Sequence, residues 1–173
     1  NNNSNLTDVH STGNIFITGN GSYVGGLSAV TIGGFTYTNT YSTGNITING
    51  TGNRIGGLIG WSNWTAPTNQ GTLNSYSSGN INIVRTGTYV GGLIGESNSN
   101  SVDSYSVSSI SVGENSSYIG GLAGSFSNGP NIDKNYSSGR ITVGDNSTNV
   151  GGFIGQLDGG NTITNSFYDT DSS

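Results

Sequence analysis

The chain has no cysteine, no methionine and only two prolines among its 173 residues. Without cysteine it can form no disulfide, no thiolate-bound zinc site and no iron–sulfur cluster, and it has no cysteine nucleophile. Its single histidine, His10, excludes a metal centre built from several imidazoles. Because methionine is missing even at position 1, we expect a processed or excised piece of a larger product.

Charge is also scarce, with 8% charged residues and a net charge of −5. The four basic residues are dispersed: Arg54, Arg85, Lys134 and Arg140. Nucleic-acid binding and a polybasic membrane anchor both need clustered lysine and arginine, so we expect neither partner. No apolar run approaches the roughly 18 residues of a transmembrane helix, and we expect no membrane insertion. These few dispersed groups provide no acid–base cluster, so we expect no enzyme activity, no catalytic residue and no cofactor.

What the chain does have is glycine, with 31 residues, and abundant asparagine, serine and threonine. Glycine pairs recur near 30-residue intervals, at 25/26, 56/57, 91/92, 120/121 and 151/152. A second marker precedes each pair, as HSTGNI, YSTGNI, YSSGNI, YSVSSI and YSSGRI. Such regularity predicts one repeat domain over 1–173, with repeats at about 8–38, 39–73, 74–102, 103–132 and 133–164 and a partial coil at 165–173.

Within each repeat, apolar residues alternate with period two, as in Ile46/Ile48 and Ile81/Ile83, which predicts short strands. Two or three such strands cannot bury an apolar face alone, whereas stacked coils share one core. The sequence therefore predicts an all-β fold, a parallel β-solenoid of about five 29–35-residue coils plus a partial terminal coil. At roughly 4.8 Å per coil the stack is about 25–29 Å long. Val24 and Leu27 both point inward only if the chain bends at the glycine pair.

Equivalent residues of the coils should stack into columns. Two apolar columns are expected, namely Val24, Ile55, Val90, Ile119 and Val150, and Leu27, Leu58, Leu93, Leu122 and Phe153. An aromatic column comprises His10, Tyr41, Tyr76, Tyr105, Tyr136 and Phe167, and a polar turn column comprises Asp8, Asn39, Asn74, Asp103, Lys134 and Asn165. Ring stacking and amide ladders hold register in such rods, so a structural role accounts for these columns.

The segments GGLIG, GGLAG and GGFIG resemble the core of the GLUG-repeat family, and the ending SFYDTDSS resembles the closing segment that often follows such arrays. The first copy departs from the motif as GGLSA, and the fourth lacks the glycine and asparagine of SSGNI. The resemblance implies a secreted or surface-attached microbial repeat protein, including adhesins, and an extracellular or cell-surface location. It attaches no catalytic residue to the motif.

Nine Asn-X-Ser/Thr triplets begin at Asn2, Asn5, Asn20, Asn45, Asn49, Asn63, Asn115, Asn135 and Asn146. The composition alone gives a similar number, so their placement is more informative than their count. Asn20, Asn49, Asn115 and Asn146 lie in the turn before a glycine pair, and Asn63 lies in the longest insertion. We expect these five as glycosylation candidates in a host that performs the modification.

Two other features are candidate sites. Glu114 and Asp145 occupy the same turn position in successive coils, where two carboxylates could share a calcium ion or simply be solvated acids. The insertion from Trp61 to Leu73 carries both tryptophans, and Trp61 and Trp64 either bind a sugar or partner or fold back over a coil edge. We favour the interpretation that this loop folds back over a coil edge.

Taken together, these features predict a non-enzymatic extracellular structural or adhesive repeat protein, a rod or filament-forming subunit that stacks end to end. Its partners are further copies of itself or neighbouring repeats of a larger parent chain. The alternative is a glycan- or partner-binding adhesin module that uses the Trp61/Trp64 loop.

Overall fold

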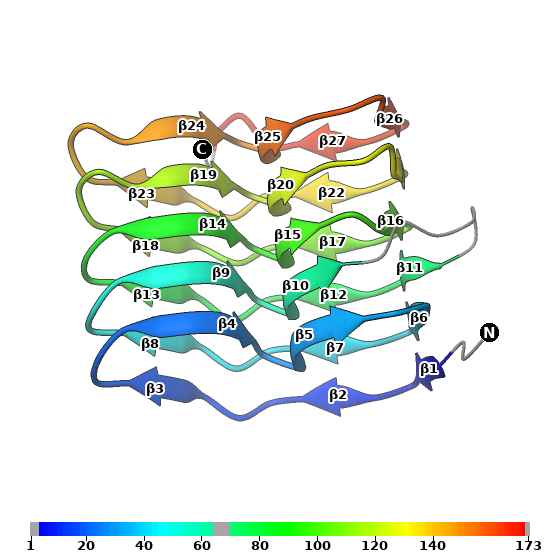
Figure 1. The fold of residues 1–173 in the computed structure, drawn as a ribbon, viewed down its shortest axis with the longest axis horizontal. Helices are drawn as coiled ribbons and strands as arrows, with labels where there is room; N and C mark the ends of the chain where they lie inside the picture. Colours follow the sequence, from blue (N-terminus) through cyan, green and yellow to red (C-terminus); the bar gives the residue numbers. More distant parts are fainter. Residues whose placement is uncertain (1–3, 64–69, 172–173) are drawn as a thin grey trace.

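The computed structural model describes residues 4–63 and 70–171, and every regular element within them is a β-strand. The strands form five sheets in which all neighbouring strands run parallel. The chain winds upward as a stack of coils from the N-terminal end to the C-terminal end (Figure 1). This arrangement confirms the predicted parallel β-solenoid of about five coils.

Each sheet takes one strand from every coil. Sheet A contains β1 (Ser4–Thr7), β6 (Phe35–Thr38), β11 (Gly71–Leu73), β16 (Asn100–Val102), β21 (Asn131–Asp133) and β26 (Thr162–Thr164). Sheet B contains β2 (His10–Ser11), β7 (Tyr41–Ser42), β12 (Tyr76–Ser77), β17 (Tyr105–Ser106), β22 (Tyr136–Ser137) and β27 (Phe167–Tyr168). Sheet C contains β3 (Ile15–Ile17), β8 (Ile46–Ile48), β13 (Ile81–Ile83), β18 (Ile110–Val112) and β23 (Ile141–Val143).

The remaining two sheets flank the glycine pairs. Sheet D contains β4 (Gly21–Gly25), β9 (Gly52–Gly56), β14 (Gly87–Gly91), β19 (Ser117–Gly120) and β24 (Thr148–Gly151). Sheet E contains β5 (Ser28–Ile32), β10 (Ile59–Asn63), β15 (Ile94–Ser97), β20 (Ala123–Phe126) and β25 (Ile154–Leu157). Each full coil thus has five strands, and the expectation of two or three was wrong. Several strands are only two or three residues long, too short for a period-two pattern to reveal them.

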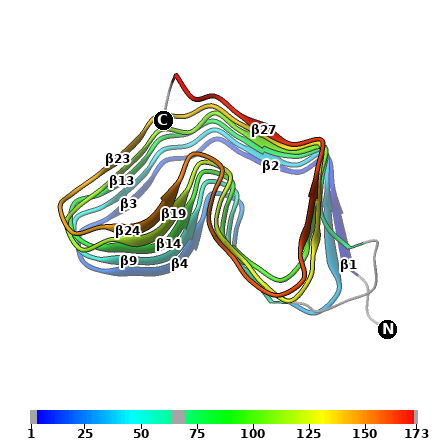
Figure 2. The same ribbon diagram turned by 90° about the horizontal axis from the view of Figure 1, so that it is seen from above.

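Seen along its axis, the coil has two lobes separated by an inward fold of the chain (Figure 2). One lobe holds a core between sheets C and D, which includes Ile48, Ile83 and Val90. The other holds a core between sheets A and E, which includes Leu58, Leu93 and Phe126. The two predicted apolar columns are therefore confirmed as columns, but they belong to different cores.

The inward fold is made by the glycine pairs, which press against a column of serines on sheet B. A Cβ atom added to Gly57 would lie 2.8 Å from the Cβ of Ser77, so a residue larger than glycine does not fit at position 57. The serine hydroxyl turns toward this corner, and Ser77 Oγ donates a hydrogen bond to the Gly92 carbonyl oxygen. The predicted bend between Val24 and Leu27 is confirmed as the first turn of this corner.

The last glycine of the motif permits a second close approach, between sheets D and E. A Cβ atom on Gly95 would lie 2.7 Å from the backbone of Arg54 and Ile55. In the first coil the same position is Ala29, on the edge strand β5, which has a strand on only one side. The residue before each inward valine or isoleucine adopts positive φ, in a column of Tyr23, Arg54, Tyr89, Tyr118 and Asn149. This bulge interrupts the register of sheet D just before the residue that points inward.

A buried polar column supports the corner between sheets A and B. The side chain of each residue accepts the backbone N–H of the coil before it: Ser75 from Thr40 at 3.0 Å, Ser104 from Ser75 at 3.1 Å and Asn135 from Ser104 at 3.1 Å. These three residues and Thr40 are almost completely buried. Because their donors and acceptors are paired along the column, these polar groups stabilise the coil stacking despite their burial.

The apolar columns lose their cover at the C-terminal end of the stack. Val150 is 43% exposed and Ile163 is 41% exposed, whereas Ile119 and Ile132, their equivalents one coil earlier, are 0% exposed. Sheets A and B have six strands and the other three sheets have five, so this end is stepped. The step exposes the edges of β23, β24 and β25 beside the additional strands β26 and β27.

Candidate functional site

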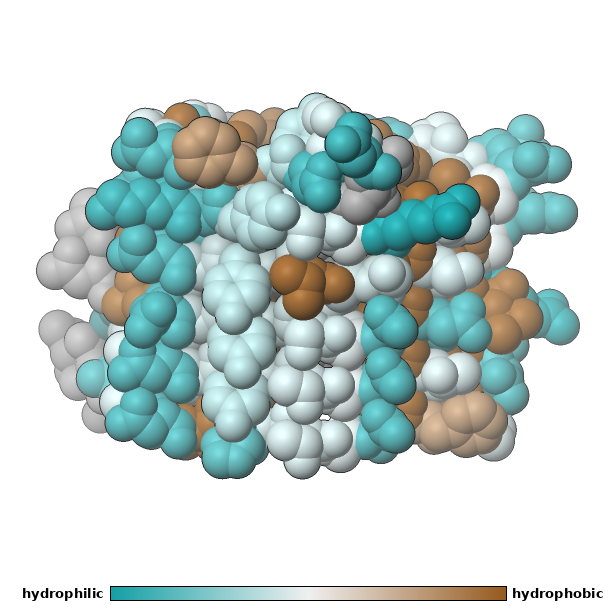
Figure 3. All heavy atoms as spheres, turned by 180° about the vertical axis from the view of Figure 1, so that it is seen from behind, coloured by the Kyte–Doolittle hydropathy of each residue, from teal (hydrophilic) through white to brown (hydrophobic). Residues whose placement is uncertain are grey.

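Aromatic rings stack along the outer surface of sheet B. His10, Tyr41, Tyr76 and Tyr105 lie face to face, with ring centroids 4.8–4.9 Å apart and interplanar angles of 3–5°. The rings form a column on the face shown in Figure 3. Burial raises the pKa of Tyr76, and the neighbouring phenols of Tyr105 and Tyr41 raise it further. The predicted aromatic column is thus confirmed for these four residues.

The ring stack ends at Tyr105. Tyr136 and Phe167 keep the strand register of the column, but within residues 4–63 and 70–171 neither ring contacts another ring of the column. A hollow of about 500 Å³ opens where the stack ends. It is lined by Asn74, Asp103, Ser104, Tyr105, Val107, Lys134 and Tyr136.

The polar turn column beside the rings is also interrupted at this hollow. All six of its residues have φ between 46° and 57°. Asparagine and aspartate tolerate this left-handed conformation better than other side chains. Asn39 Nδ2 donates to Asp8 Oδ1 at 3.1 Å, and Asn74 Nδ2 donates to Asn39 Oδ1 at 2.6 Å. Asp103 has no amide to continue this ladder, and Lys134 has no acceptor for the next coil.

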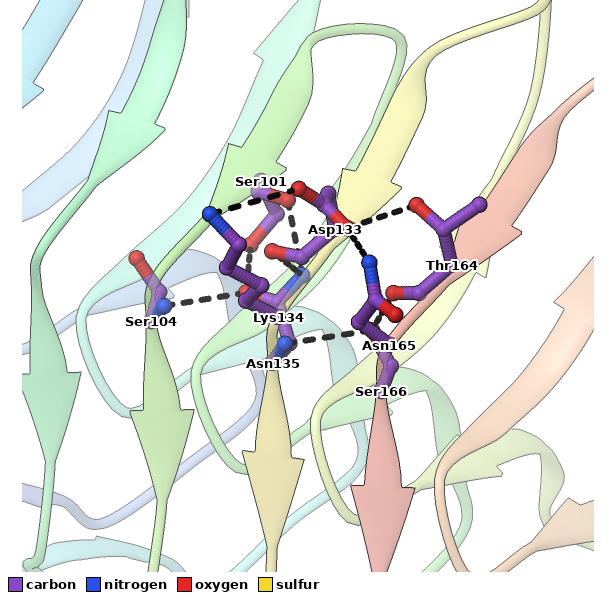
Figure 4. Close-up of polar contacts among 8 residues, drawn as sticks. All are labelled: Ser101, Ser104, Asp133, Lys134, Asn135, Thr164, Asn165 and Ser166. Carbon is purple, nitrogen blue, oxygen red and sulfur yellow. Dashed lines mark hydrogen bonds and ion pairs between the residues drawn. The ribbon is translucent and has the colours of Figure 1, made fainter.

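In the final coil, the side chains of Thr164 and Asn165 bind Asp133 in place of the interrupted turn column (Figure 4). Thr164 Oγ1 donates to Asp133 Oδ1 at 2.6 Å, and Asn165 Nδ2 donates to the same oxygen at 3.0 Å. These two hydrogen bonds, with a smaller contribution from the Lys134 ammonium, lower the pKa of Asp133. The Lys134 Nζ atom lies 4.0 Å from Asp133 Oδ2 and is largely exposed.

A second cluster lies on the outside of the corner between sheets D and E, around Arg54. Its guanidinium carbon lies 5.2–5.4 Å from the ring centroids of Tyr23, Trp61 and Tyr89. The guanidinium also donates to Glu96 and to Asn53 Oδ1. Sequence reasoning missed this cluster, because Tyr23, Tyr89 and Glu96 lie 31 to 42 residues from Arg54 and meet it only when coils stack.

Trp61 belongs to strand β10 and not to a loop, since β10 continues to Asn63. Its ring is half-buried, against Tyr23 at 5.5 Å and against Arg54. Trp64, the other half of the predicted binding loop, lies outside the described residues. The described tryptophan therefore contributes to the Arg54 cluster.

The calcium candidates Glu114 and Asp145 are exposed in equivalent turns of adjacent coils. Asn115 N–H donates to the Asp145 carbonyl oxygen at 2.8 Å, which fixes the two turns together. Glu114 also lines a hollow of about 430 Å³ beside Arg85. No group of three or more histidine or acidic side chains in the described part of the chain is arranged to hold a metal ion.

The glycosylation candidates differ in accessibility. Asn20, Asn49, Asn115 and Asn146 are exposed in turns, whereas Asn63 is half-buried and its triplet continues into residues that the structure does not describe. Asn135, which begins another triplet, is 0% exposed and fully engaged in the buried polar column. The four exposed asparagines remain predicted acceptors.

The fold and these clusters define a parallel β-solenoid with ordered side-chain columns on its surface. Comparison of the chain with protein-family models, curated proteins and solved structures gives no match in any of the three. The likeness to the GLUG-repeat family thus stays a prediction based on the repeated motif. Among the described residues, no helix has the length and apolar character needed to cross a membrane.

Proposed function

We propose that the chain is a non-enzymatic structural or adhesive protein of the cell exterior, a rod segment whose terminal coils stack end to end with further coils. The observation that carries this proposal is the loss of cover from the apolar columns in the last coil. Their residues are fully buried wherever a coil lies on both sides, and a further coil would bury the last ones in the same way.

The strand edges at the ends support the same conclusion. Each terminal strand presents backbone donors and acceptors that a parallel strand of a neighbouring coil would pair. All sheets are parallel, so the two ends of the stack are different surfaces. A contact between opposite ends does not close on itself and builds an open rod.

The step at the C-terminal end specifies what a complete cover must supply. Sheets C, D and E end one strand earlier than sheets A and B. A partner that continues all five sheets must therefore place three strands on β23, β24 and β25. Further coils of a longer parent chain or a second copy with rearranged terminal strands would meet this requirement.

The extracellular location is supported by composition and by the family resemblance. The chain has few charges, no cysteine and exposed Asn-X-Ser/Thr triplets in its turns. A surface of short polar side chains suits a passive rod.

The test is negative-stain electron microscopy of the untagged protein over a range of concentrations, beside the variants Leu157→Lys and Asn82→Lys. Leu157 is 43% exposed at the C-terminal end, and Asn82 is exposed on strand β13 in the middle of the stack. We expect rods with an axial repeat of roughly 25–29 Å or more. Leu157→Lys should shorten them by placing an ammonium in the interface, and Asn82→Lys should not. Short monodisperse particles at every concentration would contradict self-assembly.

The alternative function, glycan or partner binding through Trp61 and Trp64, has less support. The Trp61 ring already packs against Tyr23 and Arg54, which limits the ring surface left for a ligand. Binding that disappears in a Trp61→Ala, Trp64→Ala variant while rods still form would favour it.

A further inference from the structure

Three departures from the repeat meet at the hollow where the ring stack ends. Lys134 replaces an asparagine or aspartate at a left-handed position with φ of 53°. Val107, which is 41% exposed, occupies a position that is threonine or serine in the other full coils. The ring of Tyr136 leaves the stack that Tyr105 ends. All three side chains line the same hollow.

These departures weaken the repeat pattern, and the contact that Lys134 makes in exchange is an exposed one with Asp133 at 4.0 Å. A left-handed lysine costs conformational free energy that asparagine largely avoids, and it interrupts the amide ladder. An exposed valine between hydroxyls has no core to contact. Local choices that conflict with an otherwise consistent fold are expected at functional sites.

The hollow also contains polar groups that no other side chain satisfies. Among the described residues, the Asp103 carboxylate has no hydrogen-bond or ion-pair partner on another side chain. Asn74 donates to Asn39, but its Oδ1 atom receives no donor from residues 4–63 and 70–171, because Asp103 follows it in the column. The Lys134 ammonium is 4.0 Å from its nearest carboxylate oxygen. The hollow is therefore lined by two acceptors, from Asp103 and Asn74, and by one strong donor, from Lys134. Its apolar lining comes from Tyr105, Tyr136 and Val107.

We propose that this hollow binds a pyranose ring of a neutral glycan. The apolar C–H face of a sugar suits Tyr105, Tyr136 and Val107, and its hydroxyl groups suit a carboxylate, an amide oxygen and an ammonium. Its volume of about 500 Å³ falls within the roughly 300–1,000 Å³ of small-ligand clefts. Asp103 and Lys134 cancel in charge, and the chain carries a net charge of −5, so an anionic sugar is disfavoured. This site is separate from the Trp61 cluster and does not depend on end-to-end stacking.

Saturation-transfer difference NMR with lactose, maltotriose, mannotriose and chitotriose tests the proposal. We expect transfer to the ring protons of at least one sugar, and a loss of affinity of about tenfold or more in Tyr136→Ala. Lys134→Asn should weaken binding similarly while raising the thermal midpoint, because asparagine favours the left-handed position and restores the ladder. If Lys134 had a purely structural role, its replacement would weaken binding only by lowering the thermal midpoint. Weaker binding together with a higher midpoint therefore identifies Lys134 as a ligand contact.

The matched control is Phe16→Ala, which removes a 65% exposed ring from the outer side of strand β3, away from both aromatic clusters, and should leave sugar binding unchanged. No transfer to any of the four sugars would overturn the proposal. Transfer that is unaffected by both Tyr136→Ala and Lys134→Asn, or that is lost in Phe16→Ala, would overturn it as well.

Discussion

The hydroxyl group of Ser77 donates a hydrogen bond of 2.5 Å to the carbonyl oxygen of Gly92, at the corner where the two cores are separated. Ser137 makes the equivalent bond to Gly152 at 2.9 Å two coils later. The YS and GG elements of the repeat, 15 residues apart in the chain, are thus two sides of one contact. This contact explains why both elements recur together in the sequence.

Ser77→Ala should lower the free energy of unfolding by about 1 kcal/mol, because the buried Gly92 carbonyl loses its hydroxyl donor. Ser42 occupies the same column, yet its buried Oγ atom has no hydrogen-bond partner among the described residues. Ser42→Ala should therefore be neutral or slightly stabilising. Urea unfolding of both variants measures the difference, and equal losses would contradict the assigned role of the hydroxyl.

Gly57→Ala should destabilise the fold by about 3 kcal/mol, since its Cβ would overlap the Ser77 side chain and the Gly92 carbonyl oxygen. Gly19 provides the control, because a Cβ there has nothing within 4 Å. Gly19→Ala should change stability by no more than about 0.5 kcal/mol. Thermal unfolding followed by circular dichroism compares the two, and similar midpoints would show that the corner can widen.

Asn135→Ala should cost about 2 kcal/mol, because it leaves the buried Ser104 N–H without an acceptor. Asn135→Ser should cost less, since serine at the equivalent position 104 accepts the N–H of Ser75 at 3.1 Å. Chemical unfolding ranks the three proteins. A serine variant as unstable as the alanine variant would mean that the amide is required for its further bonds to Ser101.

Asp133 should make stability depend on pH in the acid range. Its pKa in the folded protein lies below the ordinary value of 3.8, so its ionised form stabilises the fold above about pH 4. That contribution is lost as the pH falls through the lowered pKa. The thermal midpoint of the wild-type protein should exceed that of Asp133→Asn at pH 7, and the gap should narrow toward pH 2.

Thr164→Val removes the hydrogen bond that contributes most to this lowered pKa. The acid dependence of its midpoint should be weaker than in the wild-type protein. A gap between wild type and Asp133→Asn that stays constant from pH 7 to pH 2 would argue against the assigned role of the carboxylate.

The repeat spacing was sufficient to predict the solenoid, the apolar columns and the bend at the glycine pair. Equivalent residues such as Val24 and Ile55 pair in register, as expected from their position in the repeat. The division into two cores was not predictable in the same way. It depends on which serine meets which glycine across the coil, and a repeat pattern does not specify contacts between its own elements.

The clusters were harder to predict than the fold. Left-handed φ at Tyr23, Arg54 and Tyr89 could not be expected, because tyrosine and arginine rarely adopt it. That conformation helps bring Arg54 against rings from neighbouring coils. The hollow beside Tyr136 could be identified only from the three-dimensional structure. One signal was present in the sequence, because Lys134 occupies a column otherwise made of asparagine and aspartate.

The pairing of each inner strand with the coils above and below it has a mechanical consequence. The ladders between coils lie along the stack axis, so a pull on the two ends loads one coil-to-coil contact at a time. A detached coil of 31 residues extends to roughly 100 Å, against the 4.8 Å or so that it occupied in the stack. Under tension the protein would lengthen about twentyfold in discrete steps, as a tether that absorbs work while its remaining coils stay folded.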